Sequence, residues 1–312
     1  MLQYVSLRNY KHTKHLINLW NVEFRFNFPI RKNIYRDLIL DDPNLNVDAS
    51  FVALYDNEPV GFIFIKTWLN ESGFETDSDS AFISLMFVTE EMRNMGIGSD
   101  LLKLAISEIK KHGTIKTLKV GNEITKIFPG LPNEFVNAPI FFINKGFVQT
   151  EGVVDMIRVL RDDKLEEYDT TLRILVSTEE DHEKILHFCL ENNFKREGYL
   201  LSQYFEKETG REVVIFRKDK QIVAVAKIDE ANSKYSNNLP FSKDKNIGTI
   251  DFIICDKDVT EQEREIINKA TKNYLIKRGC KKIIVMATDD IKFYKKLGYS
   301  AYKYYLKFEL SI

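Results

Sequence analysis

Apolar and polar positions follow the same order of patterns in the two halves of the chain. Each half opens with a strand pattern, continues into helical periodicity and then shows two β-branched and aromatic runs around a short polar turn, which is typical of a β-hairpin. In this order the segments are 3–7, 12–26 and 51–68 in the first half, and 171–176, 179–193 and 212–229 in the second.

The later part of each half repeats as well. A third strand runs toward a long amphipathic helix, after which a fourth strand and a short aromatic helix follow. These segments are 81–88, 99–113, 117–120 and 141–147 in the first half, and 248–255, 260–279, 281–286 and 293–299 in the second. The repeated order indicates a duplication. We therefore predict an α/β (α+β) fold of two tandem related domains, each with a mixed, mostly antiparallel central sheet flanked by helices.

The length of 312 residues also favours two domains, because single cores usually stop growing at roughly 250 residues. Between the two repeats, residues 161–169 read RDDKLEEYD, a charged stretch without apolar periodicity that suits a linker. We place the boundary there, which gives predicted domains at 1–163 and 164–312.

Composition limits the class of protein. Hydrophobic residues make up 44% and charged residues 29%, which is ordinary for a globular chain, and the 45 basic and 46 acidic residues almost cancel. We therefore expect no nucleic-acid partner. No apolar run approaches the roughly 20 residues of a membrane helix, and the first segment lacks the apolar core of a signal peptide. These patterns predict a cytoplasmic protein that does not bind membranes.

Cysteine and histidine spacing predicts neither a disulfide framework nor a metal site. The three cysteines, Cys189, Cys255 and Cys280, are far apart and lie in apolar stretches, so we expect buried thiols. The five histidines show no HExxH or other ligand spacing. We expect no metal cofactor.

The transition from the third strand to the long helix of the first half carries the main chemical signal. There the chain reads TEEMRNMGIG, and a helix begins at once with Ser99 and Asp100. A helix start has free backbone N–H groups and the positive end of the dipole, so it is a natural anion site. Gly96 and Gly98 allow close approach of the backbone, and Arg93 adds positive charge.

A bare RxxGxG also fits a glycine-softened turn, but the preceding strand and the amphipathic helix that follows favour phosphate binding. A dinucleotide site fits less well, because its GxGxxG must open a βαβ unit and this sequence has only one GxG, late in a mostly antiparallel order. The GK[ST] of a P-loop is absent. The segment therefore predicts a diphosphate site of another kind.

At this point the sequence resembles the GNAT acyltransferase superfamily, and in particular a bacterial subgroup with paired domains. Residues 86–98, MFVTEEMRNMGIG, resemble the family's L-x-V-x(4)-R-x-x-G-x-G/A segment, and residues 141–147, FFINKGF, resemble its FYxKxGF segment, with Ala138 at the usual alanine. The element order of the family covers both halves. We therefore expect two tandem GNAT-like domains.

The resemblance implies acetyl-CoA as cosubstrate and an N-acetyltransferase that acts on the amine of a small molecule. The loop amides would cradle the pyrophosphate, and the edge of the strand at Phe87 and Val88 would pair with the pantetheine amides. The implied cofactor-binding residues are Phe87, Val88, Arg93, Asn94, Met95, Gly96, Ile97, Gly98 and Ser99. The oligomeric state stays open between monomer and homodimer.

The sequence departs from the family pattern in both halves. Phe142 stands where many members have a tyrosine that protonates the leaving sulfur, so a catalytically lapsed acyl-CoA-binding sensor or regulator is the alternative function. In the second half Tyr294 fits the aromatic segment, but residues 256–263 contain no glycine. Thr260 and Glu263 form a capping-box pattern that would occupy the amides an anion needs. We expect this domain to be degenerate and Tyr294 to serve packing rather than the other domain's sulfur.

Glu90 and Glu123 are the candidate general bases, because Glu90 lies just past the third strand and Glu123 just past the fourth. Charged loop residues are usually only solvated, and a base acting through water is an equal alternative. The aromatic segment 19–29 and the turn 128–132 fit either the core or the wall of the acceptor pocket.

Overall fold

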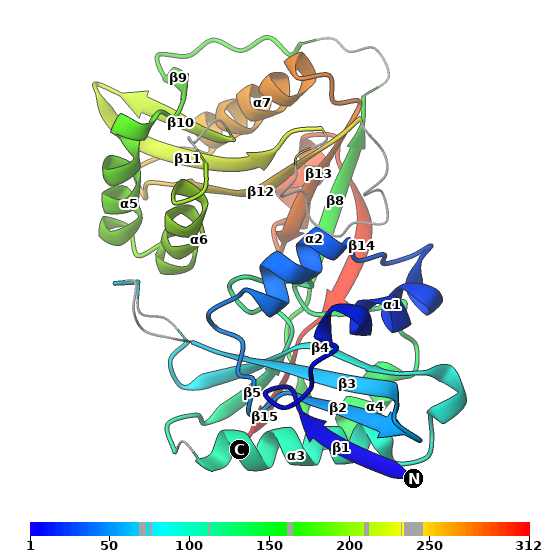
Figure 1. Cartoon of the computed structure of the whole chain (residues 1–312). Helices are drawn as coiled ribbons and strands as arrows, with labels where there is room; N and C mark the ends of the chain where they lie inside the picture. The colour runs from blue at the N-terminus through cyan, green and yellow to red at the C-terminus, as the bar shows by residue number, and fades with distance from the viewer. Residues whose placement is uncertain are drawn as a thin grey trace.

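The computed structural model describes residues 1–68, 73–74, 77–111, 113–160, 165–208, 212–231, 233 and 246–312. It contains two sheets, which confirms the predicted α/β architecture of two related units (Figure 1). The first sheet has the order β1 (Leu2–Ser6), β2 (Phe51–Tyr55), β3 (Glu58–Thr67), β4 (Ser80–Val88), β5 (Thr117–Val120), β15 (Phe308–Ser311) and β7 (Val148–Gln149). We call this sheet and its helices the first lobe.

The second sheet and its helices form the second lobe. Its order is β6 (Leu131–Pro132), β14 (Ser300–Leu306), β8 (Val153–Val159), β13 (Lys282–Thr288), β12 (Ile247–Cys255), β11 (Gln221–Asp229), β10 (Val213–Lys218) and β9 (Arg173–Val176). Each sheet has an antiparallel series with one parallel pair, β4 with β5 and β12 with β13. The mixed, mostly antiparallel character is as predicted.

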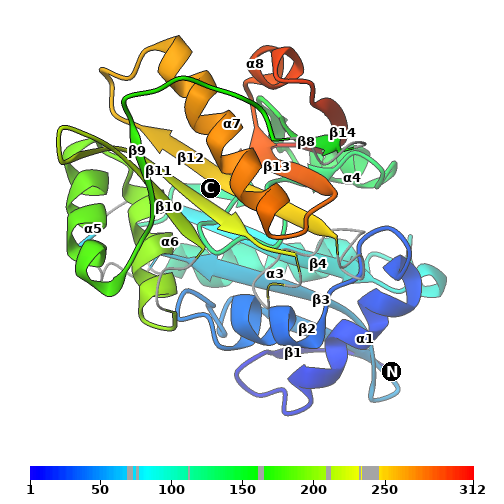
Figure 2. The ribbon, with the colours of Figure 1, turned by 90° about the horizontal axis from the view of Figure 1, so that it is seen from above.

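Helices cover both sheets. The first lobe has α1 (Thr13–Phe24), α2 (Lys32–Tyr35), the π-helical turn η1 (Arg36–Leu40), the 3-10 turn η2 (Glu90–Met92), α3 (Ile97–Lys111) and α4 (Ala138–Asn144). The second lobe has the 3-10 turn η3 (Glu179–Asp181), α5 (His182–Glu191), α6 (Lys195–Phe205), α7 (Glu261–Lys277) and α8 (Ile291–Lys296). The long helices α3 and α7 lie on the outer faces of the two sheets, away from the other lobe (Figures 1 and 2).

Both predicted hairpins form, with the same turn chemistry. Tyr55 pairs with Glu58, and Lys218 pairs with Gln221, so each turn has two residues. All four turn residues (Asp56, Asn57, Asp219 and Lys220) have positive φ angles, as a type I′ turn requires. This turn matches the right-handed twist of the strands, which explains why both halves use it.

The two halves exchange strands. β8 lies near the end of the predicted first domain but belongs to the second sheet, between β14 and β13. Conversely, β15 at the end of the chain lies in the first sheet, between β5 and β7. The predicted boundary between residues 163 and 164 falls outside the described residues, and the membership of the two sheets does not follow the two halves of the sequence.

Each sheet is buried on both faces. In the first lobe one cluster lies under α3 and α4, and a second cluster, rich in aromatic rings, lies under α1, α2 and η1. Trp20 and Phe28 of the aromatic segment are 2% and 1% exposed and belong to the second cluster, where the Trp20 indole donates a 2.7 Å hydrogen bond to the Phe28 carbonyl. That part of the segment is therefore core rather than pocket wall.

The cysteines form no disulfide. Cys189 and Cys280 are buried as expected, whereas Cys255, at the end of β12, is half-buried. All three thiols are free.

Candidate functional site

The first lobe opens where β4 and β5 part. The parallel pairing of the two strands extends only from Ser80 to Ile83 on β4, opposite Thr117 to Val120 on β5. From Ser84 onward, no other described strand pairs with this edge of β4. Residues 84–88 therefore present backbone polar groups along an open edge, and the predicted pantetheine-binding Phe87 and Val88 lie on it. The Phe87 side chain is buried, so only its backbone faces this opening.

The loop after β4 leaves a row of backbone amides free. Asn94 has φ +62° and Gly96 φ +86°, and these left-handed residues turn the chain into α3. The first helical hydrogen bond runs from the Asp100 N–H to the Gly96 carbonyl at 3.0 Å. Within the described part of the chain, no acceptor faces the N–H groups of residues 94–99. Six free amides at the positive end of a 15-residue helix are a candidate anion site.

The first turn of α3 is held rigidly by packing. Ile97 is buried in the core beneath the helix. A Cβ atom at Gly98 would lie 3.3 Å from the Met86 methyl group and 3.5 Å from the Phe141 ring, so the helix approaches β4 and α4 closely at this glycine. Met95, by contrast, is 60% exposed at the tip of the loop. The anion site is therefore preformed by the fold rather than shaped by a ligand.

Arg93 is engaged by protein groups in this structure. Its Nε donates a 2.9 Å hydrogen bond to the carbonyl of Val88, and its Nη2 pairs with the carboxylate of Glu23 on α1. The guanidinium also lies 6.0 Å from the centre of the Phe87 ring. Arg93 thus ties α1 to the end of β4, and a ligand at the Val88 carbonyl would compete with it.

In the second lobe the corresponding strands, β12 and β13, also part, but side chains cap the start of the helix that follows. β12 pairs with β13 only from Ile247 to Ile250, yet the start of α7 is closed by its side chains. Glu263 accepts hydrogen bonds from the N–H and hydroxyl of Thr260, both at 2.9 Å, and the Glu263 N–H donates to the Thr260 hydroxyl at 3.2 Å. These bonds and the one from Lys218 lower the pKa of Glu263 to about 2. The predicted capping box is confirmed.

The two candidate bases lie in different surroundings. Glu90 begins η2 with an exposed side chain, next to the phosphate loop. Glu123 is 2% exposed and follows Gly121 and Asn122, whose φ angles of +64° and +62° turn the chain back after β5. The hydroxyl of Ser84, the first residue of the open edge, donates to Glu123 Oε1.

The other oxygen of the same carboxylate is available. Glu123 Oε2 is buried and has no hydrogen-bond partner among the described residues. Unpaired buried carboxylate oxygens are costly and usually have a functional or solvent-related reason. Of the two predicted bases, Glu123 is the one placed at the opening between β4 and β5.

Comparison with known proteins matches part of the chain to a family. Residues 13–125 match the sequence profile of the Acetyltransferase (GNAT) family. The whole chain has the fold of two-domain GNAT proteins. The match covers the loop with the free amides and Glu123, and the family and fold are those of acetyltransferases.

Solved structures share the fold of the whole chain. A glucosamine N-acetyltransferase region of a fungal multi-domain β-N-acetylglucosaminidase has a TM-score of 0.86 at 18% identity, over 99% of this chain and 38% of that one. A tandem GNAT protein from the clavulanic acid biosynthesis pathway has a TM-score of 0.68 at 12% identity, over 100% and 98%. A GCN5-related N-acetyltransferase from Sphaerobacter thermophilus has a TM-score of 0.68 at 12% identity, over 99% and 95%.

These likenesses show the tandem GNAT fold. This chain spans 38% of the fungal protein's length and nearly the full length of the other two. No curated protein sequence matches the chain significantly.

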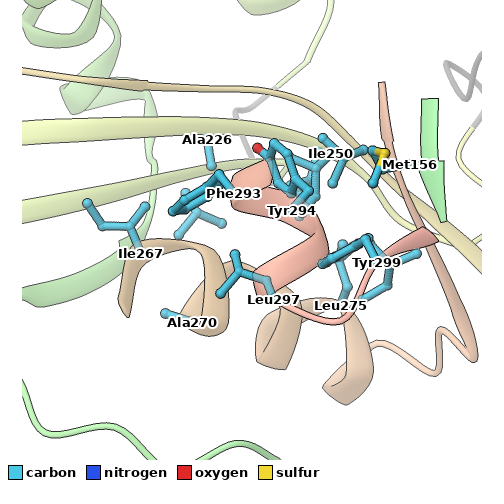
Figure 3. Close-up of a cluster of buried hydrophobic side chains, with 14 of the residues drawn as sticks. Met156, Ala226, Ile250, Ile267, Ala270, Leu275, Phe293, Tyr294, Leu297 and Tyr299 are labelled. Atoms are coloured by element: carbon cyan, nitrogen blue, oxygen red, sulfur yellow. The ribbon is translucent and has the colours of Figure 1, made fainter. Parts of the chain in front are cut away.

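The aromatic segments of both GNAT lobes serve the core. Phe142 is buried, with its ring centre 5.1 Å from that of Phe147 and 6.0 Å from that of Phe308. In the second lobe Tyr294 lies among buried side chains of α7, α8 and the sheet (Figure 3). Burial raises the pKa of Tyr294 to about 12. Its surroundings agree with the packing role expected for this tyrosine.

Sequence reasoning missed the charged residues behind Glu123. Lys66, near the end of β3, is 1% exposed and lies with Asp42 and Thr125 beside the Glu123 carboxylate. The signal was present, because a lysine in the apolar run FIFIKTW must either reach solvent or find a buried carboxylate. Asp42, however, is 24 positions earlier in the chain, and no local pattern connects it to Lys66.

A small crevice borders this cluster on the side of the second lobe. Its lining residues are Asn44, Lys66, Thr67, Trp68, Asp77, Phe82, Glu123, Ile124 and Thr125, around about 10 Å³ of open space. Helix α6 covers it: the Asn44 amide donates a 3.1 Å hydrogen bond to the Tyr199 hydroxyl, and the Trp68 and Tyr199 ring centres are 4.5 Å apart. The second lobe thus walls this side of the GNAT site.

Two further features concern the described residues only. No group of three or more histidine, cysteine, aspartate or glutamate side chains could hold a metal ion. No helix is long and apolar enough to cross a membrane.

Proposed function

We propose that this GNAT protein transfers the acetyl group of acetyl-CoA to the amine of a small molecule, and that only the first lobe binds the cosubstrate. The observation that carries the proposal is the contrast between the two helix starts. The six amides of residues 94–99 have no acceptor within the described chain, whereas at the start of α7 the Glu263 carboxylate and the Thr260 hydroxyl accept from the N–H groups of Thr260 and Glu263. A diphosphate would supply the missing acceptors in the first lobe and would be repelled by Glu263 in the second.

The open edge of β4 suits the rest of the cosubstrate. Between the phosphate loop and Ser84, no other described strand pairs with residues 84–88, although Arg93 binds the Val88 carbonyl. An extended molecule with amide groups can pair with such an edge in the way an added strand does. The reacting end would then lie at the parting of the strands, where Ser84 and Glu123 meet.

Acetyl-CoA supplies an activated thioester, whose carbonyl carbon forms a C–N bond with the amine as its C–S bond breaks. The residues of the chain align the two reactants and handle the proton of the amine. Glu123 Oε2 is the acceptor we propose for that proton, because it has no hydrogen-bond partner among the described groups while Oε1 is held by Ser84. Phe142 provides no acid, so the departing thiolate takes its proton from solvent.

The acceptor would approach from the side of the crevice beneath α6. Trp68 and Phe82 supply apolar surface there, and Glu123 supplies negative charge. The ring faces and the carboxylate both favour the cationic nitrogen of a primary amine. The crevice has about 10 Å³ of open space, so the body of the acceptor would lie outside it.

A catalytically lapsed acyl-CoA-binding sensor is the second candidate. The burial of Phe142 in the core favours it, since no tyrosine is present for the leaving sulfur at this position. Both candidates require the phosphate loop, and only the first requires Glu123.

The experiment that tests the proposal measures free-thiol release from acetyl-CoA across a panel of small amines, together with calorimetric titration of CoA. We expect CoA binding and amine-dependent thiol release that Glu123→Gln reduces at least roughly 100-fold. Binding without release above background for every amine would favour the sensor. Absence of CoA binding would overturn both.

A further inference from the structure

The side chain of Lys66 is an ammonium group buried between two carboxylates. Its Nζ lies 2.8 Å from Asp42 Oδ2 and 3.7 Å from Glu123 Oε1. It also donates to the Leu38 carbonyl at 2.5 Å and to the Thr125 carbonyl at 2.8 Å. All three donor positions are therefore used, and the ammonium cannot rotate away from the two carboxylates.

The two carboxylates are held very differently. Asp42 accepts hydrogen bonds from the Asn44 N–H at 2.8 Å, from the Asn44 amide at 3.0 Å and from the Thr125 hydroxyl, in addition to its contact with Lys66. Glu123 has the Ser84 hydroxyl on one oxygen and nothing among the described groups on the other. Lys66 is thus closely paired with Asp42, and it acts on Glu123 from a longer distance.

We propose that Lys66 is a positioning residue, which keeps Glu123 ionised and oriented so that Oε2 faces the reacting amine, and that Asp42 fixes Lys66 in that place. This inference rests on the proposed function. The physical reason is that a buried carboxylate without a nearby cation takes up a proton, whereas a carboxylate in a tight ion pair is no longer free to accept one. Lys66 lies 3.7 Å from Glu123 and is anchored by Asp42. It can therefore favour the ionised form of Glu123 without forming a tight ion pair with it.

The other charged groups around the crevice are paired among themselves. Asp77 lies 2.7 Å from Arg196 of α6 and 3.3 Å from Lys119 of β5. Arg196 also donates to the Asn122 carbonyl, one residue before Glu123. Tyr199 of α6 is neutral and accepts from Asn44. The charges that act most directly on Glu123 are therefore those of Lys66 and Asp42.

The second lobe offers a matched control. Lys227 on β11 is also buried, lies 2.8 Å from Asp229 and 4.0 Å from Glu212, and donates to the Ile228 carbonyl at 2.7 Å. Like Lys66 it is buried beside two carboxylates and binds a backbone carbonyl, but it belongs to the lobe whose helix start is capped. Lys227→Met therefore reproduces the cost of losing a buried lysine without touching Glu123.

The experiment compares the pH dependence of kcat/KM for the full-length wild type, Lys66→Met, Asp42→Asn and Lys227→Met. The acidic limb of the profile follows protonation of the base. We expect Lys66→Met to move this limb to higher pH by about one unit or more, because the carboxylate loses its cation. Asp42→Asn should move it to lower pH, because a neighbouring negative charge is removed. Lys227→Met should leave it in place.

Opposite shifts from the two variants support the inference, since a merely structural role would lower activity without moving the limb in two directions. An unmoved limb in Asp42→Asn, or a shift of the same sign in both variants, overturns it. If Lys66→Met does not fold, the test compares the acidic limb of Asp42→Asn with that of Lys227→Met. Wild-type rates in Glu123→Gln would instead refute Glu123 as the base, and no thiol release by the wild type would refute the proposed function itself.

Discussion

The hydroxyl of Tyr305 on β14 donates a 2.8 Å hydrogen bond to Oδ2 of Asp155 on β8, which joins a strand near the end of the sequence to one from its middle. The N–H of Ala287 donates to Oδ1 of the same carboxylate at 2.8 Å. Asp155 is fully buried, and burial raises its pKa to about 6, although both hydrogen bonds act in the opposite direction. This carboxylate lies on the strand that the predicted first domain contributes to the second sheet.

The first prediction concerns Asp155→Asn. The unfolded carboxyl has its ordinary pKa of 3.8, so between this value and about 6 the folded protein binds the extra proton. The stability contributed by the group is fully present below the lower value and is lost as pH rises through the upper one, by about 3 kcal/mol. Asparagine carries no charge: its oxygen can accept from the Ala287 N–H, and its amide nitrogen would donate to the Tyr305 hydroxyl in place of the present bond.

Urea unfolding at about pH 4 and about pH 7.5 checks this prediction. Relative to the wild type, Asp155→Asn should gain roughly 2–3 kcal/mol between the two pH values. An equal difference between the two proteins at both pH values would contradict the burial of a titrating carboxyl at this position.

The second prediction concerns Gly96→Asp. The new carboxylate would stand beside the proposed diphosphate, and the φ of +86° adds backbone strain of about 1–2 kcal/mol. Gly279, at the end of α7, has φ +81° and the same open space around its Cβ position, so Gly279→Asp is a matched control for strain. We expect calorimetry to show at least roughly tenfold weaker CoA binding for Gly96→Asp only. Equal losses in both variants would indicate strain instead of charge.

The third prediction concerns Phe308→Ala on β15. Phe308 is 1% exposed in the core of the first lobe, beside Phe142. Its truncation should reduce the free energy of unfolding by about 3–5 kcal/mol. Hydrogen exchange should then show lost protection in β5 and β7 of the first lobe, since β15 pairs with both. Tyr304→Ala, at a 49% exposed position on β14, is the control. Lost protection confined to the second lobe would contradict the strand exchange.

The fourth prediction concerns the contact between Gly198 on α6 and Phe74 of the first half. A Cβ atom at Gly198 would lie 2.2 Å from the edge of the Phe74 ring, which is itself buried. Gly198→Ala should therefore destabilise the wild type, although alanine is the better helix former. In a Phe74→Ala background the same change should stabilise by up to about 1 kcal/mol. A double-mutant cycle by urea unfolding measures this reversal, and additivity would contradict the contact.

Local pattern predicted much of the architecture. The predicted ends agree with the structure within about two residues at most ends of the hairpins, of the strands before the long helices, and of α3 and α7. These elements could be predicted because their periodicity and turn chemistry depend on residues that are close together in the sequence. Helix α6, the π-helical η1 and the strand exchange were not predicted. Residues 195–205 bury one face that includes Tyr199, Leu201 and Tyr204, and the place of this helix depends on the contact of Gly198 with Phe74 of the first half.

Only part of the candidate site could be predicted from local sequence patterns. The phosphate loop could be proposed from the sequence because its glycines, its helix start and its strand are consecutive. The capping box of the second lobe was predicted for the same reason and is confirmed. Glu123 could be named only as one of two candidates, since its distinction from Glu90 is burial beside Ser84 and Lys66.

The sequence by itself determined what depends on near neighbours: the duplication, the hairpin turns, the free helix start of the first half and the filled one of the second. The tertiary structure alone decided which strand completes which sheet and which charges surround Glu123. The physical reason is that pairing β8 with β14 and β15 with β5, or burying Lys66 between Asp42 and Glu123, joins groups that are far apart along the chain. Such contacts follow from how the apolar faces of both halves pack against each other, and no local pattern encodes them.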